Sequence, residues 1–237
     1  MKIRLFTILI IPYMLSGCVK PAFFAHPTAT PLPHPTATVT PAPLVPEGMI
    51  TFKRYDEREF YGQVYGHGPT AIILANMAYG GQEQWAPLVT AFDRDRFTLV
   101  AFNYFQFLQG DYASAEQEAQ VILDTFKGFG FKRTICIGAS MGASACGAIA
   151  HDPSMVGIVL IAGQNFGGTL DVAYPKLFIA GKLDPNSSFT ATDYKRADDP
   201  KKLILYPDVA VHGTSMFGTS VGDQFLKDLL DFIDKIS

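Results

Sequence analysis

The sequence predicts an α/β domain in which helices cover both faces of a mostly parallel β-sheet. Short apolar runs rich in β-branched residues recur along residues 49–237, and they alternate with stretches whose apolar residues repeat every three or four positions. Such alternation is typical of parallel strands joined by crossover helices. With about 190 residues, this segment is also long enough to bury one substantial core.

The first 48 residues are expected to lie outside this domain. Residues 1–17 begin with the basic Lys2 and Arg4 and continue with an apolar run over 5–15, which predicts an export signal peptide. Residues 18–48 are rich in Pro, Thr and Ala, and Pro-Thr-Ala-Thr occurs at 27–30 and again at 35–38. This composition predicts an extended spacer, because it lacks the apolar pattern that a folded core needs.

Eight runs along the domain predict strands. The first two are joined by four polar residues and predict a hairpin, whereas the later ones are interleaved with helical patterns and predict parallel pairing. The runs cover residues 51–55, 60–65, 70–76, 97–103, 133–138, 156–162, 176–180 and 202–206.

Two helices are predicted by apolar stripes at three- and four-residue spacing. One lies between the fourth and fifth strands and the other ends the chain. The stripe of the first consists of Ala115, Ala119, Ile122, Leu123 and Phe126, and that of the second of Phe225, Leu229, Phe232, Ile233 and Ile236. We expect both stripes to pack against the sheet.

Charge and cysteine content narrow the possible functions. The chain has a formal net charge of -3 and no long basic run, which argues against a nucleic-acid partner. Two cysteines fall within the domain, Cys136 on the fifth predicted strand and Cys146 on the helix after it. A helix packs about 10 Å from a sheet, whereas bridged Cα atoms lie within about 7 Å, so we expect two buried thiols.

The residues between these cysteines form a motif. Gly138-Ala139-Ser140-Met141-Gly142 follows the strand-like run 133–137 and leads into a small-residue helix over 143–150. Glycine on both sides of the serine permits a sharp strand-to-helix reversal, because a Cβ there would collide with neighbouring backbone. The motif therefore predicts an exposed Ser140 hydroxyl at a helix N-terminus.

This strand, turn and helix resemble the nucleophile elbow of the α/β-hydrolase superfamily, and in particular its dienelactone-hydrolase-like esterases. The resemblance covers residues 50–237. It implies a sheet of about eight strands with helices on both faces, and a serine followed along the chain by an acid and a histidine. Only residues 163–175 separate the sixth and seventh predicted strands, so no sizeable cap domain is expected.

The resemblance guides the choice of histidine and acid. His67 and His151 fall in predicted turns, whereas His212 lies between the last strand and the last helix, where the family places its base. Asp184 follows the seventh strand and is the preferred acid. Asp171, after the sixth strand, and Asp208, close to His212, remain alternatives.

The resemblance also implies an oxyanion hole made of two backbone N–H groups. One belongs to Met141, and the other to the loop after the third strand, where Ala78 is the preferred donor and Tyr79 lies one register away. Many relatives have His-Gly where this chain has Asn76-Met77, so the sequence departs from the family pattern at this loop.

These features predict a serine hydrolase that cleaves carboxylic esters through an acyl-enzyme, with Ser140 as nucleophile, His212 as base and Asp184 as acid. No nucleotide, metal or flavin motif occurs, so no cofactor is expected. The substrate is expected to be a small or polymer-borne ester that enters a shallow site. Loop residues that are candidates to line this site are Tyr79, Phe105, Phe166, Met216 and Phe217. A non-catalytic surface protein that binds ligands on a hydrolase-like scaffold, and an acyltransferase or peptidase with the same triad, are the alternatives.

The start of the chain predicts where the reaction takes place. Leu15-Ser16-Gly17-Cys18 resembles the lipobox of bacterial lipoproteins, which implies that the mature chain begins at a lipidated Cys18. Acyl chains on this cysteine would hold the protein at a membrane. We therefore expect an exported protein that is lipid-anchored to the outer face of a bacterial membrane, at the cell surface or in the periplasm.

Overall fold

The computed structural model describes residues 45–105, 111–163, 165 and 170–236. The predicted signal peptide, Cys18, nearly all of the spacer and Phe166 lie outside the described residues. None of the described helices is long and apolar enough to cross a membrane.

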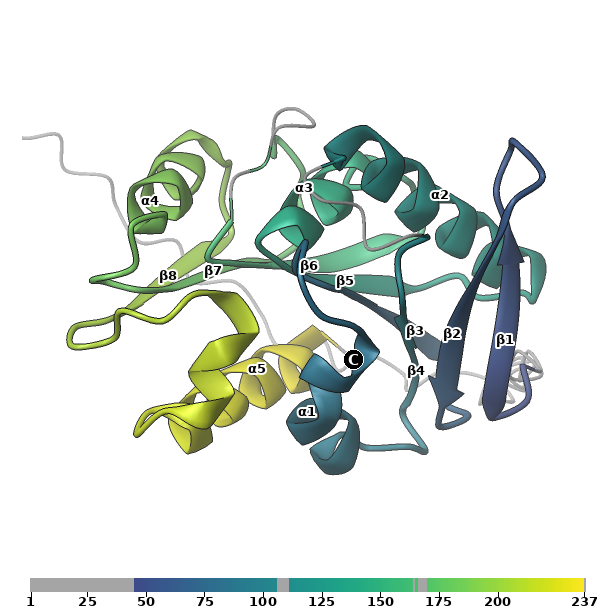
Figure 1. Cartoon of the computed structure of the whole chain (residues 1–237), viewed down its shortest axis with the longest axis horizontal. Coiled ribbons are helices and arrows are strands. Elements are labelled where there is room, and N and C mark those ends of the chain that lie inside the picture. Colours follow the sequence, from purple (N-terminus) through teal and green to yellow (C-terminus); the bar gives the residue numbers. More distant parts are fainter. Residues whose placement is uncertain (1–44, 106–110, 164, 166–169, 237) are drawn as a thin grey trace, which may run out of the picture. The chain divides into compact units, whose positions relative to one another are not determined.

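All eight predicted strands are present and form one sheet (Figure 1). Their spatial order is β1-β2-β4-β3-β5-β6-β7-β8, in which β1 pairs antiparallel with β2, β2 pairs antiparallel with β4, and the remaining neighbours are parallel. The strands are β1 (Gly48–Lys53), β2 (Glu59–Tyr65), β3 (Thr70–Ala75), β4 (Phe97–Phe102), β5 (Thr134–Ala139), β6 (Met155–Ile161), β7 (Lys176–Gly181) and β8 (Lys201–Tyr206).

Burial follows the position of each strand in the sheet. Every residue of β3, β4, β5 and β7 is buried, as expected for strands covered on both faces, whereas burial alternates along β1 and β2. The continuous apolar runs of the central strands and the alternating pattern of the hairpin therefore have a direct structural cause.

Helices cover both faces of the sheet. Figure 1 shows α2, α3 and α4 on one face and α1 and α5 on the other, and the buried apolar residues accordingly form two clusters, one on each face. The helices are α1 (Ala86–Ala91), α2 (Tyr112–Gly128), α3 (Met141–Ala148), α4 (Ser187–Arg196) and α5 (Gly222–Ile236), with two short 3₁₀ helices, η1 (Gln82–Trp85) and η2 (Gly213–Gly218).

The apolar stripes predicted for α2 and α5 face the core. The five predicted residues of α2 are buried, and so are four of the five in α5, while Phe232 is half-buried. Asp111 accepts a hydrogen bond from the Ser114 N–H at 3.1 Å and caps α2. Glu118, on the same buried face of α2, was not part of the predicted stripe.

The expectation of two free thiols is wrong, because Cys136 and Cys146 form a disulfide. Their Cα atoms lie 5.5 Å apart. The spacing of about 10 Å applies to the helix axis, and a Cα on the sheet-facing side of a helix lies about 2.3 Å closer to the sheet. The small residues of α3 close the rest of the gap: a Cβ on Gly142 would stand 2.1 Å from the Ala75 carbonyl oxygen.

The strand register brings the carboxyl ends of the parallel strands to one edge of the sheet. Ala75 of β3 is paired with Gly138 of β5, and Gly181 of β7 is paired with Tyr206 of β8. The loops that leave these ends carry Ala78, Ser140, Asp184 and His212, so the topology gathers the predicted site residues at this edge.

Candidate active site

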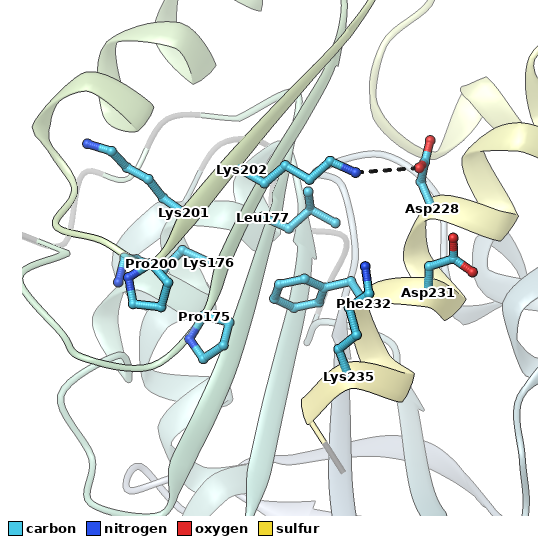
Figure 2. A pocket seen from close by; sticks show the side chains of 10 residues that line it. All are labelled: Pro175, Lys176, Leu177, Pro200, Lys201, Lys202, Asp228, Asp231, Phe232 and Lys235. Carbon is cyan, nitrogen blue, oxygen red and sulfur yellow. Dashed lines mark ion pairs between the residues drawn. The ribbon is translucent and has the colours of Figure 1, made fainter.

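Two cavities of the domain are candidate functional sites. The first, about 200 Å³ in volume, lies between the amino-terminal ends of β7 and β8 and helix α5 (Figure 2). Figure 2 shows the Lys202 amine directed toward Asp228, at 3.9 Å, above the apolar side chains of Leu177 and Phe232. Its lining is Pro175, Lys176, Leu177, Pro200, Lys201, Lys202, Asp228, Asp231, Phe232 and Lys235.

The first cavity has few reactive groups in its lining. Lys176 is its most buried amine, and burial lowers its pKa, but the Nζ atom donates to the carbonyls of Val172 and Tyr174 at 2.5 and 2.9 Å. Among the described residues, the lining contains no serine, cysteine or histidine, so it lacks a hydroxyl or thiol nucleophile with a neighbouring imidazole base.

The second cavity, about 460 Å³ in volume, lies at the carboxyl edge of the sheet. It brings together residues from the loops after β3, β5, β7 and β8 and from the first turn of α2. The lining consists of Met77, Ala78, Tyr79, Tyr112, Ser140, Asn186, His212 and Ser215. It therefore combines a hydroxyl and an imidazole in one cavity, which makes it the candidate active site.

Ser140 occupies a tight turn between β5 and α3. Its backbone has φ 54° and ψ -115°, a conformation that side-chain-bearing residues rarely adopt. Both flanking glycines are required by close packing: a Cβ on Gly138 would stand 2.0 Å from the Gly142 carbonyl oxygen, and one on Gly142 would meet the loop after β3. The turn thus presents Ser140 to the cavity at the N-terminus of α3, as the motif predicted.

Asp184 and His212 form a hydrogen-bonded pair. The Oδ2 atom of Asp184 lies 2.7 Å from Nδ1 of His212, and its Oδ1 atom accepts the Asn186 N–H at 2.9 Å. The Asp184 carboxylate is almost fully buried, whereas the imidazole is about one-third exposed and lines the cavity. With Nδ1 engaged by the carboxylate, Nε2 is the ring nitrogen available for exchange of a proton.

The other acids and histidines considered from sequence lie elsewhere. His67 pairs with Asp95 at 3.0 Å, and His151 lies 3.4 Å from Asp171, with all four side chains exposed. Asp208 is also exposed, on the turn that follows β8. The structure thus brings Asp184, and neither alternative acid, into contact with His212.

The loop after β3 is held from several sides. The Asn76 amide donates to the Phe102 carbonyl, and its Oδ1 accepts the Trp85 indole N–H at 2.8 Å. Ala78 lines the cavity. The Met141 side chain is buried in the core, while its N–H is at the first position of α3, where an intrahelical acceptor is lacking.

The aromatic lining was only partly predicted. Tyr79 lines the cavity, but Phe105 packs under the guanidinium of Arg58, with Cζ 4.7 Å from the ring centre. Met216 is buried in the core, and the half-buried Phe217 packs against it, with its ring centre 4.6 Å from that of Phe225. Sequence reasoning missed Tyr112, Asn186 and Ser215, which carry no motif and reach the cavity through the fold.

Metal chemistry has no evident ligand set in the described part of the chain, because no group of three or more His, Cys, Asp or Glu residues there is arranged to hold an ion. The lining of the candidate site also contains no lysine or arginine. The described polar groups of the site are hydroxyls, the Asn186 amide, the imidazole–carboxylate pair and backbone N–H groups.

Comparison with solved structures identifies the fold. An esterase from Exiguobacterium antarcticum has a TM-score of 0.65 at 9% identity, covering 78% of this chain and 98% of its own. A dienelactone hydrolase from Anabaena variabilis has a TM-score of 0.66 at 14% identity, covering 81% and 98%. An esterase from Pyrococcus furiosus has a TM-score of 0.66 at 12% identity, covering 81% and 93%.

These likenesses show that the domain has the α/β-hydrolase fold, and no large cap is evident among its described residues. Among the described residues of the connection 162–175, between β6 and β7, there is no helix or strand. No protein-family profile and no curated protein sequence matched the chain. At such low identities the fold is what the similar structures share with it, and the chemistry must be argued from the site.

Proposed function

We propose that this protein is a serine hydrolase that cleaves carboxylic esters through an acyl-enzyme. The observation that carries the proposal is the placement of Ser140, on a strained strand-to-helix turn, in the same cavity as an imidazole whose Nδ1 is bound by a buried carboxylate. A serine hydroxyl needs a neutral imidazole to accept its proton, and the carboxylate orients that imidazole.

The reaction follows from these roles. Ser140 Oγ attacks the ester carbonyl carbon while Nε2 of His212 accepts its proton, and Asp184 stabilises the resulting imidazolium. The tetrahedral intermediate collapses, the C–O bond to the alcohol breaks, and the alcohol leaves with the proton from His212. Water then attacks the acyl carbon and gives a proton to His212. The bond between this carbon and Ser140 Oγ breaks, His212 returns the proton to Oγ, and the carboxylic acid and free Ser140 result.

The backbone N–H groups of Met141 and Ala78 are the proposed oxyanion donors. Met141 N–H lies at the start of α3, where the helix dipole favours negative charge. Ala78 reaches the cavity from the loop after β3, which also borders Gly142 of the elbow. A lost oxyanion donor lowers turnover by about 100- to 1000-fold, so the rigidity of this loop matters for the rate.

The lining supports an uncharged ester as substrate. It contains aromatic rings from Tyr79 and Tyr112, polar groups from Asn186 and Ser215, and no cationic side chain that would attract a carboxylate. Tyr79 is highly exposed at the rim, and the connection after β6 is short. These features favour short acyl groups on a small or polymer-borne alcohol, with free access for water.

We also propose that the mature protein is exported and anchored through lipid on Cys18. The disulfide between Cys136 and Cys146 supports export, because such bonds persist in oxidising compartments outside the cytosol. Labelling of cells with a clickable fatty acid tests the anchor. A labelled protein that becomes unlabelled in Cys18→Ala is the expected result, and a freely secreted, unlabelled product contradicts it.

Short p-nitrophenyl esters and a fluorophosphonate probe test the proposed reaction. We expect hydrolysis by the wild-type protein and labelling of Ser140, and loss of both in Ser140→Ala. Ligand binding without hydrolysis or labelling would instead indicate a non-catalytic binding protein. Product analysis with competing alcohols and amines distinguishes hydrolysis from acyl transfer, and a peptide substrate tests for peptidase activity.

A further inference from the structure

Two loops of the candidate site, which come from distant parts of the sequence, pack directly against each other. The first is the loop 76–81 after β3, which carries Ala78, and the second is the turn into η2, which begins directly after His212. Gly213 has φ +58°, and a Cβ on it would stand 2.4 Å from Sδ of Met77. Met77 of the loop 76–81 therefore packs directly against the backbone of the turn that follows His212.

A second contact between the two loops runs through Gln84. Its Nε2 atom donates to the Tyr79 carbonyl at 2.5 Å, and its Oε1 atom accepts the Thr214 hydroxyl at 3.1 Å. Tyr79 follows Ala78 directly, and Thr214 lies two residues after His212. One carboxamide thus bridges the loop with the proposed second oxyanion donor and the turn with the proposed base.

Each end of the Gln84 carboxamide has a defined hydrogen-bonding role, one as donor and the other as acceptor. The donor end faces a carbonyl, which only accepts, and the acceptor end faces a hydroxyl, which can donate. Gly80 fits tightly beside it, since its φ is +97° and a Cβ on it would stand 1.7 Å from Gln84 Nε2. A carboxylate of the same shape at position 84 would oppose the Tyr79 carbonyl with a second acceptor.

We infer that Gln84 is a positioning residue for the proposed ester hydrolysis, and this role rests on the proposed function. It does not touch the reacting atoms. It fixes the distance between the oxyanion donor on one loop and the imidazole on the other, so that both act on the same carbonyl group. A displacement of about 1 Å between such groups lowers turnover by about 100-fold.

The bridge contributes more to geometry than to stability. Gln84 is half-buried at the surface of η1, and a single neutral hydrogen bond contributes about 1 kcal/mol to folding. The core below is held independently by Trp85, which is fully buried and donates to Asn76. Breaking the bridge should therefore leave a folded protein in which the two loops move relative to each other.

Four variants of the full chain test this inference. Gln84→Glu reverses the polarity at Tyr79, and Thr214→Val removes the hydroxyl at constant shape. Thr214→Ser keeps the hydroxyl and serves as the conservative rescue. Gln63→Glu makes the same chemical change as Gln84→Glu on a half-buried residue of β2, remote from the cavity, and serves as the matched control.

We expect kcat on p-nitrophenyl acetate to fall by about 10-fold or more in Gln84→Glu and Thr214→Val, with KM within about 3-fold of wild type. Thr214→Ser and Gln63→Glu should retain wild-type kcat. Hydrogen–deuterium exchange should rise in both loops, 76–81 and 212–216, in the two bridge-breaking variants alone. The double variant Gln84→Glu/Thr214→Val should lose no more than the worse single variant, because one bridge is broken in both.

The outcomes separate this inference from the proposed function. If wild type turns over and the two bridge-breaking variants match it in kcat, the positioning role is wrong and the hydrolase proposal stands. If kcat falls but exchange rises in neither loop, the bridge does not couple the loops and the inference is overturned. If wild type shows neither turnover nor fluorophosphonate labelling, the proposed function is wrong, and the positioning role of Gln84, which rests on it, is wrong as well.

Discussion

Cys136 and Cys146 are joined by a disulfide that spans Ser140. Cys136 lies on β5, the strand that ends at the serine, and Cys146 lies on α3, the helix that starts after it, with Cα atoms 5.5 Å apart. The bond therefore closes a short loop with the strand-to-helix turn of Ser140 at its middle. It joins β5 to α3 on either side of Ser140, whose backbone has a positive φ of 54°.

Removal of this disulfide should destabilise the protein. A loop of this size lowers the entropy of the unfolded chain enough to contribute about 3 kcal/mol to the free energy of unfolding. We expect the double variant Cys136→Ala/Cys146→Ala to lose about this amount in urea denaturation without reductant. Thiol titration of denatured wild-type protein is the control, and two titratable thiols from residues 136 and 146 would contradict the bond.

The acid can be identified by isosteric substitution. Asp184→Asn removes the charge that orients His212 and stabilises its protonated form, so kcat should fall by about four orders of magnitude with the fold intact. Asp171→Asn and Asp208→Asn are matched controls on exposed acids and should keep wild-type rates. A large loss in either control, with little effect at Asp184, would reassign the acid.

The strained backbone of Ser140 should lower the stability of the folded protein, and substitution by glycine should relieve this strain. Its positive φ costs about 1–3 kcal/mol for a residue with a Cβ, whereas glycine adopts such a conformation readily. Ser140→Ala and Ser140→Gly both lack the proposed nucleophile and should be inactive. We expect the free energy of unfolding to be about 1 kcal/mol higher for the glycine variant than for the alanine variant, although glycine usually lowers the stability of a folded protein. Equal stability of the two would show that the turn is not strained.

A buried carboxyl predicts how stability depends on pH. Glu118 of α2 is fully buried, where it pairs with Arg54 and accepts the Phe105 N–H at 3.1 Å. Burial raises the pKa of Glu118 from 4.5 to about 7, against the opposing effects of the Phe105 N–H and Arg54, while Asp111 adds a smaller increase. The folded state then binds the proton more tightly than the unfolded state does.

The free energy of unfolding should therefore decrease as pH rises from about 4.5 to about 7, by up to about 1.4 kcal/mol per pH unit from this group. Thermal denaturation across this range measures the effect. Glu118→Gln, which does not titrate, should lose this component of the slope, and Glu59→Gln at the exposed end of β2 should keep it. Identical slopes in wild type and Glu118→Gln would contradict the prediction.

Much of the fold was predictable because its signals are local. Apolar runs marked all eight strands. The glycines on either side of Ser140 marked the turn, because a Cβ on Gly138 would collide with Gly142, and a Cβ on Gly142 would collide with the backbone at the end of β3. The order of Ser140, Asp184 and His212 along the chain then followed from the resemblance. The contact between Asp184 and His212 agrees with that order.

Other features were not predictable because they depend on distant partners. Gln84 and Thr214 are 130 residues apart, and Arg54 and Glu118 are 64 apart, so neither pair leaves a local pattern. The disulfide was missed for a different reason. An average spacing between helix axis and sheet was applied to α3, although the Cα atoms of Cys136 and Cys146 lie 5.5 Å apart and Gly142 lets the start of this helix approach Ala75 of β3 closely.

The position of β1 has a practical consequence for handling the protein. β1 is antiparallel to β2, which is antiparallel to β4, so β1 runs parallel to β4 and the chain enters it from the side of the amino-terminal edge, where Glu47 pairs with Arg94. The cavity with Ser140 opens at the opposite edge. Coupling the domain to a bead or a carrier through its N-terminal end should therefore leave the cavity with Ser140 accessible from solution.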